Sequence, residues 1–223
     1  MRFQTFKTPT RVCKICFKEI HEISLNSIVK PQYSICSDCY RKLPLIYKKF
    51  NFEGVDCLAL YEYEEFMKQI IYQFKGCFDY ELKNVFLERF KNELKLLFMD
   101  YILVPVPSSK VHDELRGFNH VEEAFSCLGL KFAKIISKTE NIKQSDRNAE
   151  ERKEIDKILS DNGSMDLSGK KVLIVDDIMT TGSTLKACIS LVKKHHPTKI
   201  SALVLCKTRD LDFSKNSNIN KLY

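Results

Sequence analysis

The stretch that decides the fold is Lys171-Val172-Leu173-Ile174-Val175-Asp176-Asp177-Ile178-Met179-Thr180-Thr181-Gly182-Ser183-Thr184. Its four consecutive apolar residues, 172–175, predict a buried strand. Two acids follow at the carboxyl end of that strand, where open α/β sheets bind their ligands. The hydroxyl-rich residues after them lead directly into a helix expected over 183–194. The stretch therefore predicts a parallel α/β sheet with a ligand site at the end of this strand.

The loop 180–184 has the chemistry of an anion site. Backbone N–H groups at a helix N-terminus carry partial positive charge and favour phosphate, and Gly182 allows the backbone to turn tightly. The donors offered by this loop come from Thr180, Thr181, Gly182, Ser183 and Thr184. The carboxylates of Asp176 and Asp177 cannot favour the phosphate itself, so they must face hydroxyl donors or a metal. A sugar phosphate satisfies both requirements.

Two other protein classes share parts of this stretch, and both are excluded. A two-component receiver domain also begins with an apolar strand and two acids, but only 47 residues follow Asp176, too few for the rest of that fold. A Walker-B strand would need a partner loop of the pattern G-x-x-x-x-G-K-[ST], and the chain has none.

Hydrophobic periodicity predicts further elements before and after this stretch. Apolar residues at three- and four-residue steps predict helices over 66–74, 80–99 and 119–128. Short apolar runs predict strands over 101–107, 131–137 and 200–206. Residues 139–168 are expected to form a long polar loop, and the last seventeen residues a polar tail. Strands that alternate with helices support the parallel sheet.

Four of the nine cysteines form two tight pairs near the N-terminus. Cys13-x-x-Cys16 and Cys36-x-x-Cys39 are separated by nineteen residues, the spacing of a structural zinc site with four thiolates. Two such turns complete a tetrahedron without an open position, so catalysis at this metal is not expected. An odd cysteine count and a reducing compartment argue against disulfides. We therefore expect Cys13, Cys16, Cys36 and Cys39 to hold one zinc ion.

Composition is that of an ordinary globular protein, with 44% hydrophobic and 29% charged residues. No apolar run approaches the roughly 18 to 20 residues that a membrane-spanning helix needs. The first residues lack the apolar core of a secretory signal, so the protein is expected in the cytoplasm.

Charge is concentrated in the first fifth of the chain. Residues 1–50 hold ten Lys and Arg against three Asp and Glu, which accounts for the whole formal excess of +7. Four thiolates around one divalent zinc would leave this segment at about +5. We divide the chain into a zinc-finger-like module over 1–54, an α/β domain over 55–210 and a polar tail over 211–223.

The apolar strand, the two acids and the Thr-Gly-x-Thr pattern resemble the signature of type I phosphoribosyltransferases, which bind phosphoribosyl pyrophosphate (PRPP). More of the chain, about residues 12 to 206, resembles the ComF-type competence proteins, in which a four-Cys zinc module precedes a phosphoribosyltransferase-like parallel sheet flanked by helices. The matching elements are the four cysteines, Val104-Pro105-Val106-Pro107, Arg116-Gly117-Phe118-Asn119, Gln144 and Glu151-Arg152. The chain departs from the family at His120, where Gln is usual, and at Ile155, where Asn is usual.

The resemblance implies roles for the residues around the loop. Asp176 and Asp177 would hold the ribose hydroxyls, residues 180–184 the 5′-phosphate, and the loop after Pro107 the pyrophosphate with magnesium. Donors for this pyrophosphate would be Ser108, Ser109, Lys110 and Arg116, and Arg152 could approach from the long loop. No catalytic residue is assigned.

The resemblance also implies a part in natural transformation, in which single-stranded DNA is handled at the cytoplasmic face of the inner membrane. The N-terminal module interleaves aromatic and basic residues, as single-strand binders do. We expect its DNA contacts to include Lys14, Lys18, Arg41 and Lys42. Two alternatives stay open: a phosphoribosyltransferase acting on an unidentified acceptor, and a PRPP-sensing regulator without DNA contact.

Overall fold

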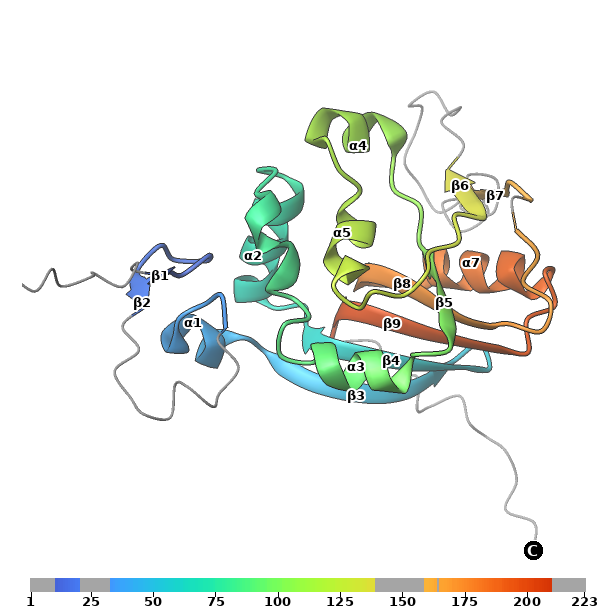
Figure 1. Cartoon of the computed structure of the whole chain (residues 1–223), viewed down its shortest axis with the longest axis horizontal. Helices are drawn as coiled ribbons and strands as arrows, with labels where there is room; N and C mark the ends of the chain where they lie inside the picture. The colour runs from blue at the N-terminus through green and yellow to red at the C-terminus, as the bar shows by residue number, and fades with distance from the viewer. Residues whose placement is uncertain (1–10, 21–32, 139–158, 164, 210–223) are drawn as a thin grey trace, which may run out of the picture.

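A five-stranded sheet forms the centre of the computed structural model, which describes residues 11–20, 33–138, 159–163 and 165–209 (Figure 1). The strands are β3 (Leu45–Phe52), β4 (Val55–Glu62), β5 (Tyr101–Pro105), β8 (Lys171–Met179) and β9 (Lys199–Lys207). Their order in the sheet is β3-β4-β9-β8-β5. The last four strands in this order are parallel, and β3 pairs antiparallel with β4. The predicted α/β class with a mostly parallel sheet is confirmed.

Helices cover both faces of the sheet and divide the core into two layers. One layer joins α2 (Glu65–Lys75), α3 (Lys91–Leu97) and α5 (His120–Ser126) to Leu203 and Leu205 of β9. The other layer joins α7 (Ser183–Lys193) to Ala202 and Val204 of the same strand. Successive side chains of a strand point to opposite faces, so β9 is apolar on both.

Three helices agree with the periodicity of the sequence. The α2 helix ends at Lys75 with Gly76 as its C-cap residue, and α7 spans the residues predicted after the loop. The α5 helix begins after Asn119, whose side chain accepts a hydrogen bond from the Glu122 N–H at 3.0 Å. An Asn in this position satisfies one of the N–H groups that the first turn leaves without a partner.

The prediction of one continuous helix over 80–99 is wrong. The structure has a 3-10 helix over Tyr80–Asn84, turns over 85–90, and only then α3. The Tyr61 hydroxyl donates to the Phe86 carbonyl at 2.9 Å, and the Phe90 N–H bonds to the Leu87 carbonyl, so the regular α-helical ladder is interrupted here. Three adjacent apolar residues, 85–87, are buried, which a single helical stripe does not allow.

The hairpin of β3 and β4 is the main element that the sequence analysis does not predict. Its turn is Glu53-Gly54, where both residues have positive φ angles of 53° and 77°. Residues 45–52, grouped on sequence with the zinc module, lie in the central sheet as β3. The apolar run of β4 from Cys57 to Tyr61 is buried, as expected of a strand covered on both faces.

The remaining predictions are met in part. The strand over 131–137 is interrupted: Phe132 makes one bridge to Leu103, and β6 (Ile136–Lys138) pairs with β7 (Leu159–Asp161) in a separate two-stranded sheet. Strand β8 continues past the predicted end to Met179, because Asp176 and Ile178 still pair with β9. Residues 139–158 of the predicted loop, with Gln144, Arg152 and Ile155, and residues 210–223 lie outside the described residues. Within the described ranges no helix is long and apolar enough to span a bilayer.

The N-terminal part is built from three short elements. They are β1 (Arg11–Val12), β2 (Glu19–Ile20) and α1 (Ser37–Lys42), and β1 pairs antiparallel with β2. They lie near the end of the sheet where α2 begins, while α4 (Lys110–Arg116) projects away from the sheet on the other side of α2 (Figure 1).

Candidate functional site

The loop between β8 and α7 forms a small hollow at the N-terminus of a three-turn helix. Its lining comprises Asp176, Ile178 and every residue from Met179 to Leu185. The Thr181 and Ser183 hydroxyls are 2.8 Å apart, and the Thr208 hydroxyl donates to the Thr180 carbonyl at 3.3 Å. The first turn of α7 contains no acidic residue. The loop therefore brings all five predicted donors together around a helix end that favours an anion.

Gly182 is required by the shape of this loop. Its φ angle is +77°, and a Cβ atom there would lie 2.6 Å from Phe52 Cζ and 2.8 Å from Met179 Cε. Phe52, at the end of β3, and Met179, at the end of β8, are both buried. These two side chains pack against the loop at Gly182. The sequence analysis predicted neither contact. The Glu53-Gly54 turn followed by an apolar run is the signal that could have placed the β3 hairpin in the sheet.

The two acids of β8 point to opposite faces of the sheet. Asp176 lines the hollow beside α7. Asp177 faces α2 and α5, where its Oδ2 atom lies 2.8 Å from Lys75 Nζ and 3.2 Å from His120 Nε2. Sequence reasoning did not find Lys75, which is 102 residues away along the chain. His120, noted only as a departure from the family, is buried and holds the carboxylate.

The acids have opposite protonation preferences. Burial and the charge of Asp177 raise the pKa of Asp176 well above its ordinary value. Burial also opposes the ionisation of Asp177, but the hydrogen bond from His120 and the charge of Lys75 outweigh it, so the pKa of Asp177 is lowered. Asp177 is therefore an anion already neutralised by the protein, whereas Asp176 is a buried acid without a basic partner among the described residues.

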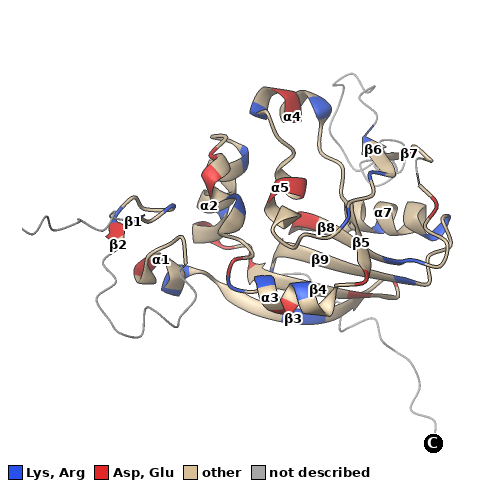
Figure 2. Ribbon diagram, viewed as in Figure 1, with Lys and Arg blue, Asp and Glu red and all other residues tan. Residues whose placement is uncertain are grey.

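The segment after Pro107 is tied to the same cluster by a chain of polar contacts. Arg116, whose side chain is 5% exposed, donates to the Lys75 carbonyl at 2.9 Å and lies 3.0 Å from Asp113 and 3.1 Å from His120 Nδ1. The Ser108 hydroxyl donates to the Asp113 carboxylate. Figure 2 shows acidic segments of α4, α5 and β8 in this region, with basic segments at both ends of α4.

The four residues predicted to donate hydrogen bonds to pyrophosphate differ in their exposure and in their contacts with the rest of the protein. Arg116 is engaged by the protein itself, and Ser108 is bonded to Asp113 and to Asn119. Ser109 is the N-cap residue of α4. Lys110 is exposed and has no ion-pair partner in the described part of the chain. The segment that carries them lies beside the carboxyl end of β8, because the strand before it, β5, pairs in parallel with β8.

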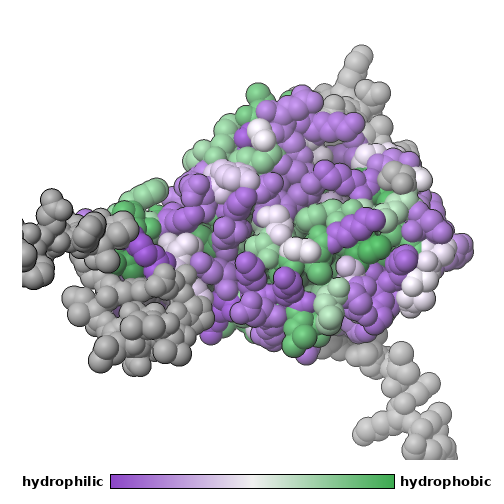
Figure 3. Space-filling model, in the orientation of Figure 1, coloured by the Kyte–Doolittle hydropathy of each residue, from purple (hydrophilic) through white to green (hydrophobic). Residues whose placement is uncertain are grey.

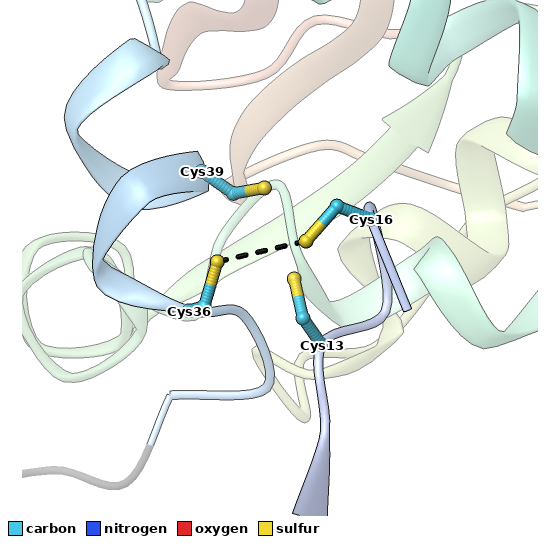
Figure 4. Close-up of side chains that lie close together, drawn as sticks. All are labelled: Cys13, Cys16, Cys36 and Cys39. Atoms are coloured by element: carbon cyan, nitrogen blue, oxygen red, sulfur yellow. Dashed lines mark hydrogen bonds between the residues drawn. The ribbon is translucent and has the colours of Figure 1, made fainter. Parts of the chain in front are cut away.

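The four cysteines of the N-terminal module converge, and their sulfur atoms point toward one another (Figure 4). All four sulfur atoms lie within 4.8 Å of one another, and Cys16 Sγ is 3.7 Å from Cys36 Sγ. Zn–S bonds of about 2.3 Å in a tetrahedron would put the sulfur atoms about 3.8 Å apart. The predicted cluster is confirmed as a group that can hold a metal ion, and its geometry fits zinc.

The thiols of the cluster differ in how readily they ionise. Burial opposes ionisation of Cys13, yet backbone N–H groups of Cys16 and Cys36 lower the pKa of Cys13 to about 7. Burial and the neighbouring thiols raise the pKa of Cys39. A divalent ion bound among the sulfur atoms would stabilise the thiolate form of all four.

The module is docked on the segment that interrupts the predicted long helix. Lys14 Nζ lies 2.6 Å from Glu81 Oε2. The Ser34 N–H and hydroxyl both donate to Glu88 Oε2, at 2.9 and 2.8 Å. Lys14, predicted to contact DNA, is therefore paired with a carboxylate of the α/β domain.

The other three predicted DNA contacts lie around one hollow. It measures about 320 Å³ and is lined by Lys18, Arg41 and Lys42 together with Cys16, Cys39 and Asp38. Arg41 pairs with Asp38 at 2.6 Å on the exposed surface, and Lys42 Nζ lies 5.9 Å from the centre of the Phe66 ring. Three cations and one carboxylate thus lie beside the cluster, whose four thiolates around one divalent zinc would carry two negative charges.

Comparison with known proteins agrees with this architecture. A family model described as the phosphoribosyl transferase domain matches residues 116–220. Competence protein ComFC of Bacillus subtilis (strain 168) is 27% identical over 216 residues, which cover 91% of this chain and 86% of that protein. Hypoxanthine-guanine phosphoribosyltransferase of Bos taurus is 41% identical over 54 residues, 23% of this chain and 25% of that protein.

Solved structures show a weaker likeness. A hypoxanthine phosphoribosyltransferase from Staphylococcus aureus has 11% identity and a TM-score of 0.38, with 65% of this chain and 72% of that chain covered. A hypoxanthine-guanine phosphoribosyltransferase from Bacillus anthracis has 13% identity and a TM-score of 0.40, with 64% and 76% covered.

The family match and the loop between β8 and α7 define the chain as an α/β protein of the phosphoribosyltransferase type. The four-cysteine cluster precedes this domain, and similarity to ComFC extends over most of both chains. The chain is therefore similar to ComFC over most of its length, and its second half matches the phosphoribosyl transferase domain.

Proposed function

We propose that this protein is a competence factor for DNA uptake that binds PRPP at the loop after β8 and single-stranded DNA at its N-terminal module. The similarity to ComFC over 91% of the chain supports a part in natural transformation. The observation that carries the ligand proposal is the convergence of Asp176 and residues 180–184 at the N-terminus of α7.

In this proposal different elements of the chain bind different parts of PRPP. The backbone N–H groups and hydroxyls of residues 180–184 hold the 5′-phosphate, and Asp176 and Asp177 accept hydrogen bonds from the ribose hydroxyls. The segment after Pro107 faces the pyrophosphate, where Lys110 supplies a positive charge. Magnesium, bound with PRPP, neutralises pyrophosphate charge. Asp176 fits a nearby cation, because it is a buried oxygen donor without a basic partner among the described residues.

Calorimetry with PRPP and magnesium tests the site. Thr181→Ala removes a hydroxyl from the loop, and a hydrogen bond to a charged group is worth about 1.5 to 3 kcal/mol, or roughly ten- to more than a hundredfold in affinity. Thr198→Ala is the matched control, since Thr198 bonds to the Lys170 carbonyl at the other end of the sheet. Equal PRPP affinity for Thr181→Ala and Thr198→Ala would contradict the proposed site.

Single-strand binding is supported by three cations, Lys18, Arg41 and Lys42, that line one hollow of the module. Replacing these three residues by Gln should lower the salt dependence of binding to a mixed-sequence oligonucleotide, because the logarithmic slope is roughly −0.7 per neutralised phosphate. The zinc ligands are unchanged in this variant, and PRPP affinity should not change.

A control variant replaces Lys95, Lys193 and Lys194, three exposed lysines of the α/β domain, by Gln. It removes the same charge and should retain the slope of the wild type. If the control loses as much slope as the N-terminal variant, the DNA contact does not belong to the module.

A second candidate function, transfer of the phosphoribosyl group to an acceptor, is favoured by the match to the phosphoribosyl transferase domain. Pyrophosphate release measured with PRPP, magnesium and candidate acceptors, with and without single-stranded DNA, separates the candidates. Release that needs an acceptor supports the enzyme. Binding of PRPP without release and without DNA affinity supports a PRPP-sensing regulator.

A further inference from the structure

A third hollow, a larger cavity, lies at the end of the sheet opposite to the acids of β8. It measures about 470 Å³, and its lining includes Lys49, Leu58, Phe98, Tyr101, Lys199 and Ser201. It shares no residue with the hollow of the β8–α7 loop. Ser201 pairs with Leu173 of β8, three residues before Asp176, which corresponds to about 10 Å along the strand.

We propose that this cavity is a second ligand site, which binds a small amphipathic anion: an aromatic or apolar body that carries one anionic group. A volume of about 470 Å³ lies within the range of about 300 to 1,000 Å³ that is typical of small-molecule sites. The site is independent of the proposed PRPP function.

The walls of the cavity suit an apolar body. The rings of Phe98 and Tyr101 are nearly perpendicular, with an interplanar angle of 88° and centroids 5.2 Å apart, so they form a corner. Leu58 is buried in the floor, and Leu97 is 46% exposed at the rim. Figure 3 shows that hydrophobic and hydrophilic residues are mixed over this face of the molecule. An aromatic ring that enters this corner meets ring faces and edges in the arrangements that aromatic pairs prefer.

The hydroxyls of two largely buried residues supply the polar part. Ser201 is 5% exposed and Tyr101 is 9% exposed. Neither hydroxyl has a hydrogen-bond partner in the described part of the chain, and no side-chain N or O atom there is fully buried without one. Both hydroxyls therefore remain accessible. Because both residues line the cavity, a ligand inside it can form hydrogen bonds with these hydroxyls.

The net charge of the ionisable side chains that line the cavity favours an anionic ligand. Lys199 Nζ is 3.7 Å from Asp56 Oδ2, a loose and exposed pair. Lys49, which pairs with Leu58 in the hairpin, has no ion-pair partner within the described ranges. The three charged side chains therefore sum to one positive charge, which matches a ligand with one anionic group.

The test uses 8-anilinonaphthalene-1-sulfonate, a fluorescent aromatic compound with one anionic group, titrated into the folded full-length protein. Lys49→Gln should weaken its binding about tenfold, the effect of losing one charge-assisted contact. Lys48→Gln is the matched control, because Lys48 directly precedes Lys49 on β3 and does not line the cavity. It should change the affinity less than twofold.

Further arms distinguish the cavity from other surfaces. Ser201→Ala should also weaken binding, while Leu96→Ser, which removes an apolar side chain 74% exposed on α3 but outside the cavity, should not. Excess PRPP should leave the fluorescence unchanged. Equal affinity for Lys49→Gln and Lys48→Gln, loss of the signal in Leu96→Ser, or displacement by PRPP would each overturn the proposal.

Discussion

Gly182→Ala tests how the loop that we assign to phosphate is supported. The φ angle of +77° costs an L-residue roughly 1 to 2 kcal/mol. The new Cβ would also lie 2.6 Å from Phe52 Cζ and 2.8 Å from Met179 Cε, and overpacking of buried side chains typically costs about 1 to 3 kcal/mol. The free energy of unfolding should therefore fall by roughly 2 to 5 kcal/mol.

Gly117→Ala isolates the contact from the backbone strain. Gly117 has a φ angle of 80° and a ψ angle of 2°, almost the conformation of Gly182, but an added Cβ would meet nothing within 4 Å. Its variant should lose only the roughly 1 to 2 kcal/mol of strain. Any gain from the less flexible unfolded chain applies to both variants and cancels in their difference.

Urea denaturation followed by far-UV circular dichroism measures both variants, with the midpoint and slope fitted separately. We expect Gly182→Ala to be less stable than Gly117→Ala by about 1 to 3 kcal/mol. Shortening Phe52 to Leu in the Gly182→Ala background should recover part of the difference, since it removes the closest atom. Equal losses for the two glycines would refute the packing of Phe52 and Met179 beneath the loop.

The remaining predictions concern the metal and the acids of β8. Purified wild-type protein should contain one zinc per chain by elemental analysis under reducing conditions, and Cys39→Ser should lose it and become sensitive to proteolysis in the module; zinc-free wild type would contradict this. Asp177→Asn should be less stable than wild type at pH 7, with a difference that shrinks in acid, because a lowered pKa stabilises the fold above the ordinary value near 3.9 and this contribution disappears as the pH falls through the lowered value. Asp176→Asn should be more stable than wild type at pH 7, with a gain that vanishes below about pH 4, because a raised pKa means that ionisation of the unfolded chain opposes folding above the ordinary value. The free energy of unfolding of each variant is measured at pH 7 and below about pH 4. If both substitutions changed the stability at pH 7 in the same direction, the opposite pKa shifts of Asp176 and Asp177 would be contradicted.

Local patterns were sufficient where one short segment contains all the information. The apolar strand, the loop 180–184 and the following helix are contiguous, so their chemistry could be predicted together. The two Cys-x-x-Cys turns are equally local, and only the docking of one turn on the other had to be assumed. The α/β class followed from the same segments, because alternation of strands and helices constrains topology.

Long-range contacts explain what the sequence did not show. The Tyr61 hydroxyl of β4 donates a hydrogen bond to the carbonyl of Phe86, which lies 25 positions later in the chain. The hydrophobic periodicity of residues 80–99 contains no information about this contact. Lys75 reaches Asp177 across 102 positions. Residues 45–54, which form β3 and its turn, were assigned to the basic module because charge was counted by position, although Lys48 and Lys49 belong to a strand of the central sheet.

The environments of Asp176 and Asp177 give them different parts in the proposed function. Strand alternation turns Asp177 toward α2 and α5, where Lys75 forms an ion pair with it and His120 donates a hydrogen bond to it, so that both helices are joined to β8. The same alternation turns Asp176 toward the loop, where burial leaves it without a basic partner among the described residues. A ligand that brings hydroxyl donors or a cation improves the environment of Asp176 far more than that of Asp177. We therefore infer that Asp176 contributes mainly to ligand affinity, whereas Asp177 contributes mainly to the stability of the ligand edge of the sheet.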